Sequence, residues 1–184
     1  MLTWRTGWQL LEQQRANLRQ REEEFIEWVV KTPPIRLSGA AAIFTAATTG
    51  IPLGLTHHLK HNRVLHERVL LIASVTTDEP RVEDADRIRL VPVGAGITRV
   101  IFHFGFIETP NIMEGLRLAC RQPELQGIDY YFRRVMVIAC EKASGMAVWR
   151  KSLFAMMHLN ANLPAAYFGV PPTQVVEVGL EVEI

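Results

Sequence analysis

The sequence lacks an excess of charge of either sign, because 20 Lys and Arg residues are balanced by 19 Asp and Glu residues. A domain that binds a nucleic-acid backbone needs surplus cations, so this balance argues against nucleic acid as a partner. Cysteine is also scarce. The two cysteines, Cys120 and Cys140, form no CxxC pair, and we expect small buried thiols in a reducing compartment rather than a disulfide or a metal site.

A long apolar run of the kind that crosses a membrane is missing as well. The stretch from Leu37 to Thr56 carries no charge, but five hydroxyl side chains, three glycines and Pro52 interrupt it. We therefore expect a short strand and a turn there instead of a membrane-spanning helix. The N-terminus lacks the apolar core and cleavage site of a secretory signal, which indicates a cytosolic location.

Motifs of the common catalytic and nucleotide-binding classes are absent too. The sequence contains no GxxxxGK[ST], GxGxxG or GxSxG pattern, and such patterns supply phosphate-binding amides or a nucleophile elbow. We expect no enzymatic activity, no catalytic residue and no cofactor. The chain has 184 residues, of which 48% are hydrophobic and 21% are charged, and this is the size and composition of one globular domain.

Hydrophobic periodicity predicts an α/β (mixed α+β) fold. The heptad-spaced residues Leu11, Leu18 and Phe25 indicate one long amphipathic helix from Trp8 to Val30. Apolar runs and alternating patterns predict strands at Ala40–Ala46, Arg68–Thr76, Arg87–Val93, Thr98–Phe106, Phe132–Cys140 and Val175–Ile184, with a hairpin turn at Gly94–Gly96. Helical patterns fall at Pro52–Asn62, Asn111–Arg121 and Met146–Asn160. We expect a central mixed sheet with helices on both faces, parallel pairs at its centre and antiparallel pairs towards an edge.

Four of the six histidines fall in one short segment: His57, His58, His61 and His66. On a helix, His57 and His61 lie one turn apart, as in an HxxxH zinc site. The segment offers no third ligand at fixed spacing, so we expect these histidines to serve local structure or an interface and to bind no catalytic metal. The alternative is a free-standing small-molecule- or metal-binding α/β domain that uses His57, His58 and His61.

Eight ordered segments of the chain carry a resemblance to a known family: Thr3–Leu11 (TWRTGWQLL), Gly39–Thr45, His57–Leu71 (HHLKHNRVLHERVLL), Glu79–Val82 (EPRV), Gly105–Ile112 (GFIETPNI), Tyr130–Arg134 (YYFRR), Trp149–Ala161 and Pro171–Ile184. Together they resemble the cytoplasmic C-terminal domain of bacterial low-affinity potassium uptake permeases of the Kup (KUP/HAK/KT) family. Two departures are His58, where the family more often has Asn, and Ile107, where Met is common.

The resemblance implies a regulatory and assembly domain on the cytoplasmic side of the bacterial membrane. Its partner would be the transmembrane part of a potassium:proton symporter, residues 1–34 would form a connector helix, and residues 35–184 would form one domain. We expect a homodimer, with Leu11, Leu18 and Phe25 as dimer or connector residues. By analogy with related transporters, a nucleotide second messenger such as cyclic di-AMP is a candidate ligand. The candidate interface or regulatory residues are His57, His61, Asn62, His66 and Glu67. A free-standing adaptor that docks through the first helix is a further alternative.

Overall fold

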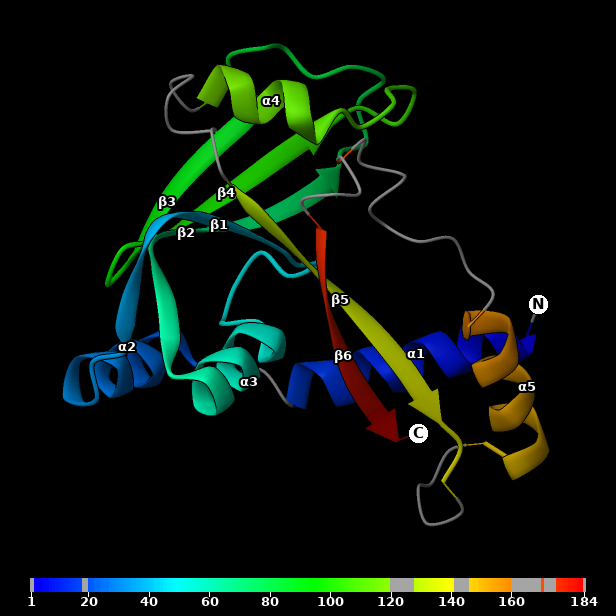
Figure 1. Cartoon of the computed structure of the whole chain (residues 1–184). Helices are drawn as coiled ribbons and strands as arrows, with labels where there is room; N and C mark the ends of the chain where they lie inside the picture. Colours follow the sequence, from blue (N-terminus) through cyan, green and yellow to red (C-terminus); the bar gives the residue numbers. More distant parts are fainter. Residues whose placement is uncertain are drawn as a thin grey trace.

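A computed structural model describes residues 2–17, 20–119, 128–140, 146–159, 170 and 175–183 of the chain. Within these ranges the helices are α1 (Leu2–Asn17), α2 (Glu22–Lys31), α3 (Leu53–Asn62), α4 (Ile112–Ala119) and α5 (Val148–Leu159). The strands are β1 (Ile35–Phe44), β2 (Val64–Thr76), β3 (Ile88–Gly94), β4 (Ile97–Phe104), β5 (Asp129–Ile138) and β6 (Val175–Glu183) (Figure 1). Among the described residues, no helix is both long and apolar enough to cross a membrane.

The strands form one sheet in the order β3-β4-β2-β1-β5-β6. β1 pairs in parallel with β2 and β5, β2 pairs in parallel with β4, and β5 pairs in parallel with β6. The edge strand β3 is antiparallel to β4. The predicted mixed sheet is therefore confirmed, with its parallel pairs at the centre and its antiparallel pair at one edge.

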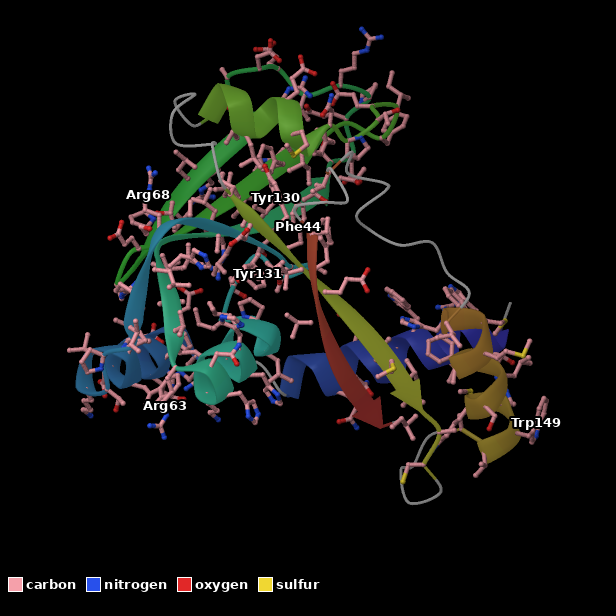
Figure 2. The ribbon with its side chains drawn as sticks, viewed as in Figure 1. Phe44, Arg63, Arg68, Tyr130, Tyr131 and Trp149 are labelled. Carbon is pink, nitrogen blue, oxygen red and sulfur yellow. The ribbon has the colours of Figure 1, made fainter. Side chains whose placement is uncertain are left out.

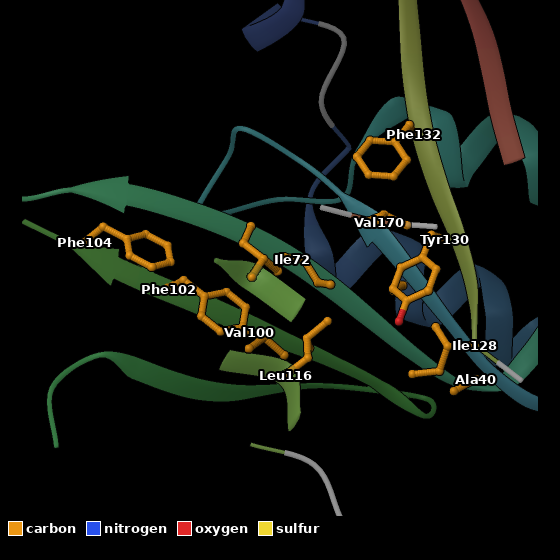
Figure 3. Close-up of a cluster of buried hydrophobic side chains, with 12 residues drawn as sticks. Ala40, Ile72, Val100, Phe102, Phe104, Leu116, Ile128, Tyr130, Phe132 and Val170 are labelled. Carbon is orange, nitrogen blue, oxygen red and sulfur yellow. The ribbon is translucent and has the colours of Figure 1, made fainter. Parts of the chain in front are cut away.

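One face of the sheet packs against α4. Ala40 and Ala42 of β1, Ile72 of β2 and Phe102 of β4 form a buried cluster with Leu116 of α4 (Figure 3). These strand residues alternate along the chain with residues of the opposite face, because successive side chains of a strand point to opposite sides.

The opposite face packs against α2 and α3. Val69 and Leu71 of β2 form a second buried cluster with Phe25 and Val29 of α2 and with Leu55 of α3. Figure 1 shows α4 on one side of the sheet and α2 and α3 on the other. The predicted helices on both faces are thus confirmed.

The edge pair β3-β4 is closed by a two-residue turn. Ala95 and Gly96 form the turn between Gly94 and Ile97 and have φ values of 50° and 79°. A tight hairpin needs positive φ at both central residues, which glycine adopts without strain. This confirms the hairpin predicted at Gly94–Gly96.

The outer half of β5 extends past the rest of the sheet. β5 pairs with β1 only over Asp129–Tyr131, but it pairs with β6 as far as Ile138. A third buried cluster covers this extension and joins Leu11 of α1, Phe154 of α5 and Val182 of β6. α1 and α5 therefore belong to a small core of their own at the end of the β5-β6 pair (Figure 1).

A close approach of α1 and α5 depends on one glycine. A Cβ atom built on Gly7 would overlap the ring of Phe154, and Phe154 is fully buried. Only a residue without a side chain lets this ring lie against the α1 backbone.

The prediction of one helix from Trp8 to Val30 is wrong, because α1 and α2 are separate helices. Between them Gln20 forms an isolated antiparallel bridge with Ile51, whose N–H donates to the Gln20 carbonyl at 3.0 Å. Arg21 is extended, with φ −67° and ψ 144°. Helical periodicity runs through this segment, but the tertiary contact overrides it.

A buried cation fixes the position where α2 begins. The two terminal nitrogens of Arg99 in β4 donate to Oε1 of Glu22 and to the carbonyl of Gly50, each at 2.6 Å. Glu22 Oε1 also accepts the Gly50 N–H at 2.7 Å. These bonds tie the first turn of α2 and the loop after β1 to the central sheet.

Two loops that follow neighbouring parallel strands are also tied together. The Phe106 N–H donates to the Glu79 carbonyl at 3.0 Å, and the Glu108 carboxylate accepts the Gly105 N–H at 2.7 Å and the Arg87 guanidinium at 3.0 Å. The Gly105 N–H and Arg87 hold the pKa of Glu108 below its usual range. The EPRV and GFIETPNI segments of the sequence therefore interlock here.

The predicted strands differ from the observed ones mainly at their starts. β1 begins at Ile35 rather than Ala40, and β2 begins at Val64 rather than Arg68, because Ile35 and Val64 start the parallel pairing of the two strands. The first four residues of β1 alternate between apolar and polar (IRLS) but are exposed, and so short an alternation was not enough to place the start of the strand.

Candidate functional site

A narrow pocket of about 20 Å³ lies between α3 and the sheet. Its walls come from β1, β2, β5, β6 and α3 and consist of Ala41, Ile43, Gly54, Leu55, His58, Leu65, His66, Val69, Tyr131, Phe132 and Val178. β1 leads through α3 to β2 on one side, whereas β5 lies on its other side. The strand order therefore reverses beside β1, but Leu65 and His66 lie near the start of β2 and Tyr131 near the start of β5, so the pocket is not at the carboxyl ends of the strands, where open α/β sheets commonly bind ligands.

Two imidazoles and a phenol form the polar part of this pocket. His66 of β2 is only 6% exposed, and its Nε2 lies 3.3 Å from Oδ2 of Asp129, whose side chain is 51% exposed. The Tyr131 ring meets both imidazoles edge-on, with centroids 5.3 Å from His58 and 6.1 Å from His66. Tyr131, labelled in Figure 2, thus places an aromatic ring beside both histidines at the start of β5.

The helix α3 holds His58 in its neutral form. Burial lowers the pKa of His58, and the neighbouring His66 lowers it further. Asn62, one turn later, places its Nδ2 3.0 Å from His58 Nδ1. An amide nitrogen donates, so this contact is a hydrogen bond when Nδ1 of His58 carries no proton.

Burial likewise keeps Tyr131 neutral. It raises the pKa of the phenol, and the charge of Asp129 adds to this effect. The lining residues include no Lys or Arg. A phosphate needs cations or several amides, so the lining offers it few partners.

The structure separates the histidines that the sequence groups. His57 and His61 lie on the exposed side of α3 with ring centroids 5.9 Å apart, while His58 and His66 line the pocket. Within the described ranges, no group of three or more His, Cys, Asp or Glu residues is placed to hold a metal ion. The pair on α3 therefore has no third ligand in that part of the chain.

The other sequence candidates fall in different places. Asn62 supports His58, and Glu67 is exposed on β2. Leu11 is buried in the α1-α5 core, whereas Phe25 is buried against α3 and the sheet. Leu18 lies outside the described residues. The heptad residues Leu11 and Phe25 thus belong to two separate cores of one chain.

Sequence reasoning did not single out Gly54 and Tyr131 of the pocket wall, nor Asp129, which contacts His66. Tyr131 reaches the pocket and Asp129 reaches His66 because β5 pairs with β1 at Ala41–Ile43, a pairing between segments far apart in the sequence. The one signal in the sequence that could have pointed to Tyr131 was its place in the YYFRR segment. A Cβ on Gly54 would meet no atom within 4 Å, so this residue leaves the pocket open.

The chain is similar in sequence to known proteins. The sequence profile described as the K+ potassium transporter C-terminal domain matches residues 38–184. The chain is 49% identical over 189 residues to "Probable potassium transport system protein Kup 3" of Bradyrhizobium diazoefficiens, covering 100% of the chain and 31% of that protein. It is 40% identical over 191 residues to "Probable potassium transport system protein Kup 2" of Syntrophobacter fumaroxidans, covering 100% of the chain and 29% of that protein.

A Kup protein of Nitrosomonas eutropha, "Probable potassium transport system protein Kup", is 37% identical over 188 residues, which cover 100% of the chain and 29% of that protein. No solved structure gives a significant match. The chain spans about a third of the length of these curated relatives. The profile match covers most of the chain, and the matched relatives align with all of it. The chain therefore belongs to the family of K+ potassium transporter C-terminal domains found in Kup proteins.

Proposed function

We propose that this chain is the regulatory and assembly domain of a Kup-type potassium:proton symporter, and that it lies on the cytoplasmic side of the membrane. The observation that carries the proposal is the α3 pocket, which occurs in a domain shared with potassium transport proteins. The residues that line the pocket include no nucleophile paired with a base, and burial favours the neutral forms of His58 and Tyr131. Such a site suits binding of an effector rather than chemistry on a substrate.

An effector in this pocket would act on α3. The helix contributes Gly54, Leu55 and His58 to the wall, and the strands contribute the opposite wall. A ligand that binds only one position of α3 shifts the population of the domain towards that position by its difference in affinity. The transmembrane part of the permease would respond to that shift.

Cyclic di-AMP is the specific ligand suggested by analogy. The rings of His58 and Tyr131 favour stacking of a nucleobase, whereas the absence of Lys and Arg among the lining residues disfavours its phosphates. Titration calorimetry with cyclic di-AMP and with adenosine distinguishes these contributions. Binding of adenosine alone would assign the site to an uncharged ring.

Filling the pocket tests the regulatory proposal. Gly54→Met in the full-length permease places a flexible side chain into the open space beside Gly54, and we expect an altered potassium uptake rate at unchanged protein abundance. The matched control is Gly179→Met on β6, because a Cβ there also meets no atom within 4 Å and Gly179 does not line the pocket. Equal uptake by the wild type and both variants would contradict a regulatory pocket.

The assembly part of the proposal includes a homodimer. Leu11 and Phe25 are buried in the cores of a single chain, so pairing through these residues would require α1 and α2 to leave their places. Light scattering of the intact chain over a range of concentrations tests the dimer. A monomer at every concentration would remove this part of the proposal.

A further inference from the structure

The helix α5 shows apolar rather than charged residues on its solvent side, although Phe154 on its inner side is buried as in a normal surface helix. Its solvent-facing residues carry no charge; they are Val148, Trp149, Ser152, Leu153, Met156 and Leu159. We call these residues the α5 outer face. A surface helix usually shows charged residues to water and apolar residues to the core.

The Lys and the Arg of α5 instead make contacts within the domain. Lys151 is fully buried, and its Nζ donates to the Cys140 carbonyl at 2.9 Å. The Nε of Arg150 donates to the Thr3 hydroxyl of α1 at 3.3 Å. The charged groups of α5 thus bind other parts of the domain, whereas the residues of the α5 outer face are apolar or uncharged.

The helix α1 adds two indole rings next to this face. Trp4 and Trp8 are stacked with centroids 6.0 Å apart, Trp4 contacts the Phe154 ring at 5.4 Å, and Trp8 contacts the His158 ring at 6.1 Å. Trp149 is 69% exposed and projects outward from α5 (Figure 2). Three of the four tryptophans of the chain therefore gather on α1 and α5, with part or most of each ring in water.

The composition of this surface indicates what covers it. Indole rings prefer the boundary between lipid tails and water, where the ring is buried and the N–H stays hydrated. An interfacial helix lays an apolar face with Trp and Leu into the boundary. A pair of protein copies usually needs about 20–30 residues on each side, far more than the six of the α5 outer face with Trp4 and Trp8. The composition therefore favours a lipid surface over a second copy.

The position of the α5 outer face also favours a lipid surface as its partner. The family is a C-terminal domain, and about two thirds of each matched relative lies outside the matched region. In those relatives the preceding part of a potassium transporter connects at the α1 end of the domain. Figure 1 shows that this end of α1 lies beside α5. The apolar surface thus lies where the domain meets the rest of the transporter.

We propose that the α5 outer face, with Trp4 and Trp8, docks onto the lipid headgroup boundary of a bilayer and sets the orientation of the domain on the membrane. The proposal does not depend on the α3 pocket or on its ligand. The driving force is burial of apolar surface, so docking does not require anionic lipid and is insensitive to salt.

Vesicle sedimentation tests this docking with the intact chain. Wild-type protein is expected to bind neutral phosphatidylcholine vesicles, to remain bound in ~1 M salt, where the Debye length is only about 3 Å, and to show a blue shift of tryptophan emission. The triple variant Trp149→Gln/Leu153→Gln/Met156→Gln is expected to bind about a hundredfold more weakly, because it removes most of the apolar contact area.

A matched triple variant controls for the loss of exposed apolar residues in general. Val30→Gln/Leu90→Gln/Phe106→Gln changes three exposed apolar side chains away from α1 and α5 and is expected to bind as the wild type does. The proposal is overturned if the wild type does not bind vesicles, or if the α5 triple variant binds them equally well. It is also overturned if the wild type forms a dimer in solution that does not bind vesicles and that only the α5 triple variant disrupts.

Discussion

Replacing Glu22 by Gln removes the charge that neutralises a buried arginine. Arg99 is 3% exposed and its Nε has no hydrogen-bond partner among the described residues, while Glu22 is 30% exposed. Removing one partner of a fully buried ion pair costs about 3–5 kcal/mol, and a hydrogen bond to a charged group contributes about 1.5–3 kcal/mol. Because Glu22 is partly hydrated, we expect Glu22→Gln to lower the free energy of unfolding by about 2–4 kcal/mol.

Urea unfolding followed by circular dichroism measures this loss. For a domain of this size, about 1 kcal/mol corresponds to roughly 2–4 °C in Tm, so a decrease of about 5–15 °C is expected. Glu24→Gln is the matched control, because Glu24 lies in the same first turn of α2 and is exposed, and its cost should stay within about 0.5 kcal/mol. Adding Arg99→Met to Glu22→Gln should recover much of the loss, since no buried charge is then left alone.

The pH dependence of the same pair has a defined sign. Burial alone would raise the pKa of Glu22, but the hydrogen bonds from Arg99 and from the Gly50 N–H lower it below its ordinary value of 4.5. The contribution of Glu22 to stability is therefore complete above pH 4.5 and is lost as the pH falls through the lower folded value. Equal unfolding free energies of Glu22→Gln and Glu24→Gln at neutral pH would falsify the reasoning about Arg99.

Three further predictions concern the small core and the histidines. Gly7→Ala should cost about 1–3 kcal/mol and lower the Tm, because the added methyl group overlaps Phe154; an unchanged Tm would contradict the close approach of α1 and α5. The pKa of His58 is lowered in the folded state, so the wild type should lose stability as the pH falls below 6.5. His58→Gln should flatten the curve of unfolding free energy against pH between about pH 7 and 5. Parallel curves for the wild type and His58→Gln would disprove this role of His58. Zinc calorimetry should show no one-to-one micromolar site; a site that is lost in a His57→Ala/His61→Ala double variant would overturn this expectation.

The sheet was predictable because its strands carry their own signals. From Val69 to Val75, β2 is an almost continuous apolar run between two covered faces, and the β3-β4 hairpin alternates around Gly94–Gly96, so local pattern and tertiary structure agree. The break between α1 and α2 was not predictable in the same way. It depends on Arg99, which lies more than seventy residues further along the chain and binds Glu22, and a periodicity argument contains no information on such a partner.

The candidate site was likewise predictable from the sequence only in part. The sequence singles out His66 and Asn62 because they fall in a histidine-rich segment, and both contribute to the pocket region. It does not reveal that β5 brings Asp129 and Tyr131 beside them, because parallel strands far apart in the sequence pair through the global strand order. The sequence also does not show that His57 lies on the exposed side of α3 while His58 lines the pocket. This depends on how α3 is rotated about its axis against the sheet.

The length of β5 has a mechanical consequence. Its ten residues form one uninterrupted strand of about 33 Å, with Tyr131 against α3 at one end and the small core of α1 and α5 around the other. Only the first three residues of β5 pair with β1, whereas β6 pairs with β5 from Tyr130 to Ile138. One continuous run of hydrogen-bonded backbone therefore joins the pocket residue Tyr131 to the α1-α5 core, with no loop between them.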